Sequence, residues 1–353
     1  MTANASYKLS PVNSAKGVKN VKLPESMVEI EIAAPGDPDV LRPRNVPLPQ
    51  PAAGELLIRI QAAGVNRADV LQRLGQYPLP PGVNPIPGLE VAGEVVALGA
   101  GVSAFVVGDK VCALTNGGGY AEYCVVPAGQ TLPIPHGMDA IQAAAIPEAF
   151  FTVWSNLFEF GKAAKDHRVL IHGGASGIGT TALMLCREFG IQAFSTAGNA
   201  AKCAAIRDLG ADAINYREED FVDVIRGHTS GQGVDIILDI MGGSYFSRNV
   251  DALARDGRLV IIGFLGGATV EKVDLLAVAT KRVIVTGSML RSRTAAEKAA
   301  IADDLYKKVW PILSAGRCLP IIDKVFPLLS AADAHRRMEA GDHIGKIVLK
   351  VAE

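Results

Sequence analysis

Excess charge of either sign and long apolar runs are both missing from this sequence, and each absence excludes a class of protein. The 353 residues carry 35 Lys and Arg against 36 Asp and Glu, which gives a formal net charge of −1. A balanced chain without a dense basic block lacks the electrostatic footprint of nucleic-acid binding. No apolar run reaches the length that spans a bilayer. We therefore expect neither a nucleic-acid partner nor a membrane partner.

Cysteine is scarce, and its spacing excludes another group of proteins. None of the five cysteines forms the C-x-x-C pair that is typical of zinc and redox sites. They are Cys112, Cys124, Cys186, Cys203 and Cys318. An odd number of cysteines in apolar surroundings predicts buried free thiols in a reducing compartment, so we expect a cytoplasmic protein.

The first 26 residues have no hydrophobic periodicity. They contain four lysines among Ser, Asn and Pro, and they lack a secretory signal pattern. We expect residues 1–26 to be a flexible extension or leader.

The most informative feature that is present is a glycine turn between an apolar run and a helical pattern. Residues 169–172 are strand-like, Gly174 to Gly179 form the turn, and residues 180–187 continue as a helix. Because glycine has no Cβ, backbone N–H groups and the helix N-terminus can approach a pyrophosphate there. Ser176 stands where the dinucleotide fingerprint has its second glycine, so a turn that only packs a helix on a strand remains the alternative.

The end of the next apolar run, residues 190–198, decides which nucleotide fits. An acidic residue there would bond the ribose 2′-hydroxyl of NAD, and none is present. The run ends in Ser195, Thr196 and Gly198, and Lys202 follows. Hydroxyl groups and a lysine favour a 2′-phosphate, so we expect NADPH. An ordinary solvated helix position is the alternative for Lys202.

The pattern of the chain divides it into a β-rich part and an α/β part. Short β-type runs between Gly and Pro turns fill residues 28–114, whereas strands alternate with helices between about 168 and 289. Six strand runs predict a doubly wound parallel sheet. They are residues 169–172, 190–198, 213–216, 234–239, 258–263 and 282–287. A helix over 295–313, a strand over 321–325, a helix over 330–340 and a strand over 346–350 follow.

Five motifs stand in an order that is typical of one family. They are AGVNRADV at 63–70, PGLEVAG at 87–93, VGDKV at 107–111, GGGYAEY at 117–123 and AAAIP at 143–147. The chain resembles the medium-chain dehydrogenase/reductases over nearly everything after residue 27. Within this family NRAD at 66–69, GQY at 75–77, PEA at 147–149, GGSY at 242–245 and LRSR at 290–293 are similar to the zinc-free quinone oxidoreductases, in the p53-inducible branch.

The resemblance implies an α/β fold with two domains. A GroES-like, β-rich catalytic domain is expected over residues 27–149 and 291–353, and a Rossmann domain with a six-stranded parallel sheet over residues 150–290. The apolar strand at 283–285 would be an exposed sheet edge in a monomer, and relatives pair this edge across a two-fold axis. We therefore expect a homodimer.

The departures from the zinc alcohol dehydrogenases fall on the metal ligands. That subgroup has a Cys at the position of Asn66, a His at that of Leu89 and a Cys at that of Glu148. Asparagine is a poor zinc ligand and leucine cannot bind metal, so no three-ligand site can form. The cysteine-rich loop of the structural zinc is also missing. We expect no metal.

The loss of a Lewis acid narrows the chemistry. Reduction of an ordinary ketone leaves an alkoxide that needs a metal or a strong donor, whereas a quinone takes up hydride as a delocalised, weakly basic phenolate. We predict transfer of hydride or electrons from NADPH to a small-molecule quinone. An α,β-unsaturated carbonyl is the rival acceptor, which would make the protein an alkenal or enoyl reductase. An NADPH-binding structural or RNA-binding protein of the zeta-crystallin type is the alternative of another class.

The resemblance also assigns site residues. Asn66 can donate an amide N–H to the acceptor oxygen, and Tyr77 can stack on a flat ring. Their alternatives are a local backbone contact and the anchoring of a Pro-rich loop. The implied cofactor residues are Thr152, Gly174, Ser176, Gly177, Ile178, Thr196, Gly198, Lys202, Tyr216, Gly263, Phe264, Leu265, Leu290 and Arg291.

Other polar residues are expected to be structural. We expect Asp69 and Glu90 to pair with Arg67 and Arg73 without touching substrate. We also expect His172, just before the glycine turn, to be packed or bonded locally and not to act as a base.

Overall fold

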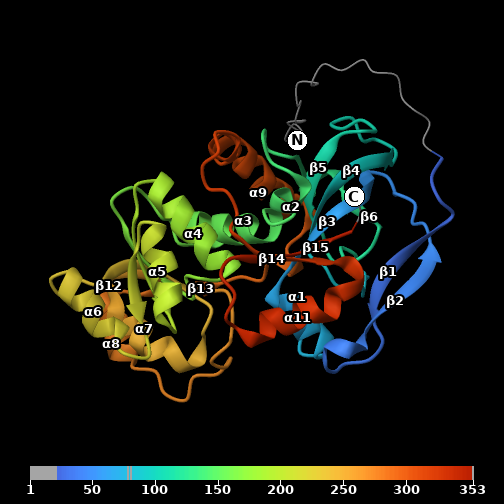
Figure 1. Ribbon diagram of the computed structural model, residues 1–353. Coiled ribbons are helices and arrows are strands. Elements are labelled where there is room, and N and C mark those ends of the chain that lie inside the picture. Colours follow the sequence, from blue (N-terminus) through green and yellow to red (C-terminus); the bar gives the residue numbers. More distant parts are fainter. Residues whose placement is uncertain (1–21, 78, 80–81, 352–353) are drawn as a thin grey trace. The chain divides into compact units, whose positions relative to one another are not determined.

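The computed structural model describes residues 22–77, 79 and 82–351 (Figure 1). The expected extension at residues 1–26 therefore lies, up to residue 21, outside the described part. The chain forms two compact units. The first contains the described residues up to Pro147, Lys324–Ala340 and the residues from Ile347 on, and the second contains Glu148–Asp323 and Gly341–Lys346. Residues 291–323 and 341–346 thus belong to the second unit, whereas the sequence prediction placed them with the β-rich domain.

The first unit is built on β-strands. Its described part contains a hairpin of β1 (Ser26–Ile32) and β2 (Leu41–Pro47) and a sheet with the order β14-β15-β3-β4-β5-β7, in which β6 also pairs with β3. The sheet strands are β3 (Glu55–Val65), β4 (Glu90–Leu98), β5 (Lys110–Leu114), β6 (Tyr123–Pro127), β7 (Thr131–Pro133), β14 (Ile322–Pro327) and β15 (Lys346–Lys350). The apolar side chains of β3 and of the first half of β4 are buried, and Val96, Ala97 and Leu98 at the end of β4 are partly buried against the same core.

The sequence pattern found β1, β3, β4, β5, β14 and β15 and overlooked β2, β6 and β7. Each of the overlooked strands contains proline. In a sequence pattern proline argues against a strand, because it cannot donate a hydrogen bond to a sheet ladder. Pro43 of β2 pairs with Ile30, whose N–H donates to the Tyr120 carbonyl at 2.8 Å on the other side of β1, so this position needs no N–H from β2. Proline is therefore tolerated at this position.

The second unit contains a parallel sheet with the strand order β10-β9-β8-β11-β12-β13. The strands are β8 (Arg168–His172), β9 (Gln192–Ala197), β10 (Asp212–Asn215), β11 (Val234–Asp239), β12 (Leu253–Ile261) and β13 (Ile284–Gly287). All pairings between neighbours are parallel. The expected α/β fold with a doubly wound sheet is thus confirmed. The strand order reverses between β8 and β11, which is where ligands bind in such sheets.

Helices pack against this sheet, as Figure 1 shows within the second unit. α4 contacts β8 and β9, α5 contacts β9 and β10, and α7 and α8 contact β12. The helices are α4 (Gly177–Glu188), α5 (Ala200–Asp208), α6 (Phe221–His228), α7 (Phe246–Ala252) and α8 (Leu275–Lys281). Aliphatic and aromatic side chains of the strands and of α6 fill the core between them.

The helix that the sequence predicts over residues 295–313 is broken in two. α9 (Ala295–Lys308) ends before α10 (Trp310–Ser314) begins, and Pro311 lies in the first turn of α10. Proline lacks an N–H and its ring clashes with the carbonyl of residue i−4, so a continuous helix cannot pass through it. The remaining helices are α1 (Arg67–Arg73), α2 (Ala140–Ala143), α3 (Pro147–Val153) and α11 (Ala331–Ala340), with short turns η1 (Pro38–Val40), η2 (Ala128–Gln130), η4 (Gly243–Tyr245), η5 (Leu290–Ser292) and η6 (Leu328–Ser330).

Two further predictions concern the whole chain. All five cysteines are buried free thiols, as expected. Within the described ranges, no helix combines the length and the apolar character needed to cross a membrane.

Candidate functional site

The glycine turn leads directly into α4 at the carboxyl end of β8. Ser176 caps the helix, and its Oγ accepts the Gly179 N–H at 3.0 Å. A Cβ at Gly174 would lie 2.0 Å from the Ser195 Oγ, and one at Gly179 would lie 2.4 Å from the Gly173 carbonyl oxygen. These two positions therefore admit only glycine, and the turn brings the positive end of α4 to the sheet edge.

The hydroxyl groups at the end of β9 correct one expectation. Ser195 and Thr196 are 0% and 2% exposed. Ser195 Oγ donates to the Ile171 carbonyl at 2.6 Å, whereas Thr196 Oγ1 accepts the Gly173 N–H at 3.3 Å and lies 3.1 Å from a ring nitrogen of His172. Both hydroxyls support the glycine turn from inside the domain and do not face a 2′-phosphate.

His172 belongs to this interior support. Its ring lies 2.8 Å from Asn249 Oδ1 and is 1% exposed. Burial lowers its pKa to about 4, so the ring is neutral at pH 7. The expected packing role for His172 therefore agrees with its contacts.

Two predicted cofactor residues, Gly198 and Tyr216, meet at the edge of β9 and β10, and a third, Lys202, lies in the helix that follows Gly198. Tyr216 is 44% exposed, and a Cβ at Gly198 would lie 2.5 Å from its hydroxyl oxygen. The Asn199 side chain caps α5 by accepting the Lys202 N–H at 2.9 Å, which sets Lys202 in the first turn of that helix. The Lys202 Nζ donates to the Gly341 carbonyl at 2.6 Å. The edge thus carries a cation and a phenol, and no carboxylate at the end of β9.

The loop after β12 lies at the same sheet edge. The Leu265 N–H donates to the Ile240 carbonyl at 3.0 Å, and the Phe264 and Leu265 side chains are 52% and 54% exposed. Gly263 passes close to Ile240, because a Cβ there would lie 3.0 Å from the Ile240 carbonyl oxygen. Exposed apolar side chains at the carboxyl edge are suited to cover a flat ligand.

A carboxyl group fixes the neighbouring turn. Asp239, at the end of β11, accepts the N–H groups of Met241 and Gly242 at 2.7 and 3.1 Å. Burial raises the pKa of Asp239 to about 6, against the opposing effect of these two hydrogen bonds. No motif in the sequence singles out Asp239.

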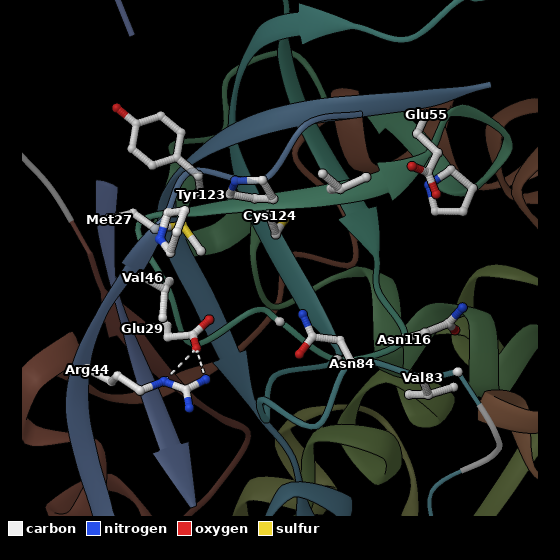
Figure 2. Close-up of a pocket in the computed structure, with 17 residues that line it drawn as sticks. Met27, Glu29, Arg44, Val46, Glu55, Val83, Asn84, Asn116, Tyr123 and Cys124 are labelled. Atoms are coloured by element: carbon white, nitrogen blue, oxygen red, sulfur yellow. Dashed lines mark hydrogen bonds and ion pairs between the residues drawn. The ribbon is translucent and has the colours of Figure 1, made fainter. Parts of the chain in front are cut away.

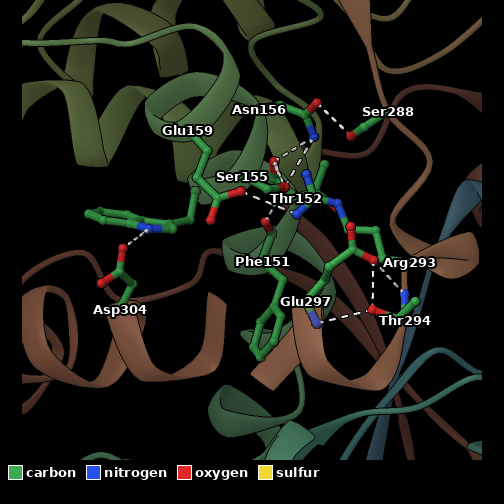
Figure 3. Close-up of polar contacts among 11 residues, drawn as sticks. Phe151, Thr152, Ser155, Asn156, Glu159, Ser288, Arg293, Thr294, Glu297 and Asp304 are labelled. Atoms are coloured by element: carbon green, nitrogen blue, oxygen red, sulfur yellow. Dashed lines mark hydrogen bonds and ion pairs between the residues drawn. The ribbon is translucent and has the colours of Figure 1, made fainter. Parts of the chain in front are cut away.

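Thr152 lies where α3 continues into η3 (Trp154–Phe160), a π-helical turn (Figure 3). The Gly161 N–H donates to the carbonyl of Asn156, five residues back, at 2.8 Å. Asn156 Nδ2 donates to the Thr152 carbonyl at 2.9 Å, and Asn156 Oδ1 accepts from Ser288 Oγ at 2.8 Å. π-Helical turns often occur at functional sites. The Asn156 amide thus ties the segment around Thr152 to the chain after β13.

Leu290 and Arg291 are both buried, at 7% exposure. The Arg291 carbonyl accepts from the Nζ of Lys298, which is 1% exposed. Burial lowers the pKa of Lys298 to about 8, opposed by the carboxylate of Glu148. Sequence reasoning missed Lys298, although its spacing with Ile301 places it on the apolar face of α9.

In the first unit, Asn66 is held by two carboxylates. Its backbone N–H donates to Asp69 Oδ2 at 2.8 Å, and its Nδ2 donates to Glu90 Oε1 at 2.9 Å. Asp69 and Glu90 are 0% exposed, and Asn66 is 9% exposed. A Cβ at Gly64 would lie 2.1 Å from Glu90 Oε1, so glycine at 64 makes room for the carboxylate.

Asp69, Glu90 and Arg73 make contacts that differ from the predicted pairing of these carboxylates with Arg67 and Arg73. Asp69 Oδ1 accepts the Gly88 N–H at 2.9 Å, and Glu90 orients Asn66. Arg73, fully buried, forms its two-bond ion pair with Glu339 at 3.0 and 2.6 Å. α11 brings Glu339 to α1 from 266 positions along the chain, which local sequence does not reveal.

A buried polar cluster supports this region. The Tyr120 hydroxyl lies 3.4 Å from Asp69 Oδ2 and 3.0 Å from His335 Nε2. Burial and the nearby Arg73 guanidinium lower the pKa of His335 to about 3. Asp69 is therefore fixed from both sides, by backbone N–H groups and by the cluster.

Tyr77 is half-buried in the loop after α1. Residues 78, 80 and 81 of the same loop lie outside the described part of the chain. A hollow of about 500 Å³ elsewhere in this unit is lined by Glu29 and Arg44, an ion pair, and by the chain around Asn84 and Tyr123 (Figure 2). Neither Asn66 nor Tyr77 lines it, so it is not the predicted acceptor site.

The donor set for a metal can also be checked. Among residues 22–77, 79 and 82–351, no three His, Cys, Asp or Glu side chains are grouped as a metal site would require. Leu89, at a ligand position of the zinc enzymes, is buried at 2% exposure.

A β-rich unit and a parallel sheet with a glycine turn at its carboxyl edge define an oxidoreductase of the dehydrogenase type. Residues 52–136 match the GroES-like domain of alcohol dehydrogenases, and residues 209–349 match the zinc-binding dehydrogenase domain. The chain belongs to the medium-chain dehydrogenase/reductase family and is quinone oxidoreductase-like.

Three similar proteins illustrate the range of the family. The quinone oxidoreductase of Rattus norvegicus is 31% identical over 318 residues, which cover 89% of this chain and 94% of that protein. A mycobacterial structure complexed with NADPH is 31% identical with a TM-score of 0.81, covering 92% of this chain and 100% of that one. The CurK enoyl reductase is 27% identical with a TM-score of 0.82, covering 93% of this chain and 100% of that one.

Proposed function

We propose that this protein is a zinc-independent quinone oxidoreductase that uses NADPH. The observation that carries the proposal is the edge of β9 and β10, where Tyr216 lies against Gly198, Lys202 stands in the first turn of the following helix, and no carboxylate ends β9. A lysine there suits a 2′-phosphate, whereas a 2′-hydroxyl is usually bound by an acidic residue.

The residues of the second unit fit the rest of this cofactor. Gly174 and Gly179 let the turn pack closely on Ser195 and Gly173, and the N-terminus of α4 supplies N–H groups and a positive dipole for a pyrophosphate. Thr152 and the loop with Phe264 are assigned to the nicotinamide half. NADPH, when bound, supplies hydride to an acceptor. The structural relative complexed with NADPH supports the assignment.

Asn66 is assigned to the acceptor. Glu90 fixes its amide at 2.9 Å, so the donor is oriented before the acceptor binds. One hydride and one proton from solvent convert a quinone to a hydroquinone, and the negative charge of the intermediate step is spread over the ring. An amide donor and Tyr77 as a stacking surface are sufficient for such an acceptor.

An enone reductase is the second candidate, because an enoyl reductase is among the structural relatives at a TM-score of 0.82. Hydride addition to the β-carbon of an enone also avoids a localised alkoxide. The same residues would serve, with Asn66 at the carbonyl oxygen. The acceptor that the enzyme reduces faster decides between a quinone reductase and an enone reductase.

The proposal also includes a cytoplasmic location and a homodimeric state. Five buried free thiols support a reducing, cytoplasmic environment. The edge strand β13 exposes Ile284 and Val285 at 42% and 43%, and the adjacent α8 exposes Leu275 and Leu276 at 73% and 76%. Such an apolar edge supports a homodimer that pairs β13 with its copy.

Steady-state oxidation of NADPH and NADH tests the proposal. The acceptors are 1,2-naphthoquinone, 1,4-benzoquinone and a simple enone, and the protein is treated with a chelator beforehand. Chelator-resistant, NADPH-selective reduction of a quinone is the expected result. Turnover of the enone alone would favour the second candidate. Tight binding of single-stranded RNA at physiological salt without turnover of any acceptor would contradict both.

A further inference from the structure

A short segment near the C-terminus lies against the glycine turn. The Gly345 N–H donates to the Ala175 carbonyl at 2.8 Å, and Gly345 pairs with Ser176 as an isolated parallel bridge. Ser176 is the cap of α4, where the pyrophosphate is assigned. A Cβ at Gly177 would lie 2.4 Å from Cδ of Lys346, so the stem of Lys346 covers Gly177.

The other end of the segment lies at Lys202. The Gly341 carbonyl accepts from the Lys202 Nζ at 2.6 Å. Four residue steps separate Gly341 from Gly345 and span at most about 14 Å, so the contacts at the two ends, with Lys202 and with the pyrophosphate turn, are joined by no more than about this length of chain. The adenosine half of NADPH has to connect the same two points. Residues 341–345 therefore run alongside the proposed position of this half.

The two ends of the segment are held differently. Gly345 is buried with φ of +84°, and a Cβ there would lie 2.2 Å from the Ile321 carbonyl oxygen. The Lys346 N–H donates to that carbonyl at 2.8 Å, and the Ile344 N–H donates to Asp323 Oδ1 at 3.1 Å. Gly341 is exposed and has φ of +69°. The Gly345 end is thus anchored, whereas the Gly341 end is exposed and linked to Lys202.

We propose that residues 341–345 form one wall of the cofactor site and that Lys202 exchanges the Gly341 carbonyl for the 2′-phosphate when NADPH binds. This inference rests on the proposed use of NADPH. A phosphate dianion is a stronger acceptor for an ammonium group than a neutral carbonyl, so the exchange is favourable. NADH offers no such acceptor, and Lys202 then keeps its contact with Gly341. The contact in the free protein lowers the affinity for NADPH and leaves that for NADH unchanged.

Amide hydrogen exchange directly tests whether Lys202 leaves the Gly341 carbonyl when NADPH binds. NADPH, NADH and adenosine 2′,5′-bisphosphate are added separately at saturating concentration, and peptides that cover residues 341–346 are followed. We expect faster exchange near Gly341 with NADPH and with the bisphosphate, no change there with NADH, and lasting protection of the Gly345 amide. An equal response to NADPH and NADH, or no response to either, would overturn the inference.

Substitutions give a second test. The expected effect is a gain of affinity for NADPH relative to that for NADH, which general damage to the protein would not produce. Alanine at 341 is strained at φ of +69° and turns the carbonyl away from Lys202. We expect Gly341→Ala to raise the affinity for NADPH relative to that for NADH roughly two- to tenfold, the worth of one such hydrogen bond. In a Lys202→Ala background the same substitution should leave this relative affinity unchanged. Equal weakening for both cofactors by Gly341→Ala would contradict the exchange.

Gly345→Ala is the matched control at the anchored end. Its Cβ collides with the Ile321 carbonyl, so it should displace the segment from the glycine turn and weaken NADPH and NADH alike. The two proposals fail in distinguishable ways. Preference of the unmodified protein for NADPH without any response of Gly341 rejects only the exchange. Equal affinity for NADPH and NADH rejects the cofactor assignment and the exchange together.

Discussion

The side-chain amide of Asn66 donates to Glu90 Oε1 at 2.9 Å, and the carboxylate that receives it is 0% exposed. A buried acceptor of this kind keeps the amide in one orientation, because releasing it would leave a desolvated carboxylate with one partner fewer. In the proposed reaction the orientation of Asn66 determines where the acceptor oxygen lies.

Removal of this amide should lower activity without affecting the cofactor. Asn66→Ala is expected to reduce kcat/KM for the quinone by roughly 10- to 100-fold, since one oriented donor to a developing oxyanion is lost. The dissociation constant of NADPH should not change. Glu94→Gln is the control. Glu94 lies on β4, the strand that carries Glu90, and forms ion pairs with Arg59 and Lys110, so kcat/KM should stay unchanged. Full activity of Asn66→Ala would remove Asn66 from the site.

Lys202 should distinguish the two cofactors. Lys202→Ala is expected to weaken NADPH binding by about 1–2 kcal/mol, the order of one charge-assisted contact, and to leave NADH binding almost unchanged. Isothermal titration calorimetry with each cofactor measures both values. Arg207→Ala, an exposed residue of the same helix, is the matched control. An equal loss for NADPH and NADH would show that Lys202 has no role at the 2′-phosphate.

Acid should destabilise the protein through its buried histidines. The pKa of His172 is lowered to about 4 and that of His335 to about 3, below the usual value near 6.5. Between pH 6.5 and 4 the unfolded chain therefore binds protons that the folded chain does not, and the free energy of unfolding falls as the pH falls. Each histidine contributes roughly 1.4 kcal/mol per pH unit.

Urea unfolding at pH 7, 6 and 5 measures this slope. His335→Gln should flatten it by roughly 1.4 kcal/mol per pH unit relative to the unmodified protein. Val106→Gln, at an exposed side chain that carries no titratable group, is the control and should keep the original slope. Identical slopes for all three proteins would show that His335 titrates normally in the folded state.

Lys298 should change the stability of the protein at alkaline pH. Its pKa is lowered to about 8, whereas the unfolded chain keeps the ordinary value of 10.5. Between these pH values only the unfolded chain binds the proton, so the stability contributed by this group rises with pH. The free energy of unfolding of the unmodified protein, minus that of Lys298→Met, should increase by roughly 1.4 kcal/mol per pH unit from pH 8 to 10. A constant difference would contradict the lowered pKa.

The apolar edge of the second unit should control self-association. We expect a dimer by light scattering at micromolar concentration and a monomer for Val285→Lys, because a buried charge at a strand-to-strand contact is costly. Leu329→Lys, 69% exposed in the first unit, is the control and should remain dimeric. A monomeric unmodified protein would contradict the pairing of β13.

Much of the fold was predictable because its signals are local. The strands of the parallel sheet are apolar runs bounded by turns, and the glycine turn announces the start of α4. The break at Pro311 is equally local, although the helical pattern on both sides hid it. Strands with prolines, such as β2, escape a search for apolar alternation.

The site was predictable only in part, because side-chain direction depends on distant partners. The hydroxyl groups of Ser195 and Thr196 turn toward β8 and away from a ligand, which depends on the neighbouring strand and not on their own spacing. Glu339 reaches Arg73 from the far end of the chain. Lys298 was within reach of a helical-wheel argument, since it shares a face with Ile301 and Leu305.

The last strand, β15, begins at Lys346 in the second unit and continues from Ile347 in the first, where Ile347 pairs with Val65. Proteolytic removal of everything after Ala340 would therefore take away a strand from one unit and the Gly345 contact with Ala175 from the other. The segment from Gly341 to Lys350 thus has two structural roles, so its loss should weaken cofactor binding and open the β-rich sheet in the same step.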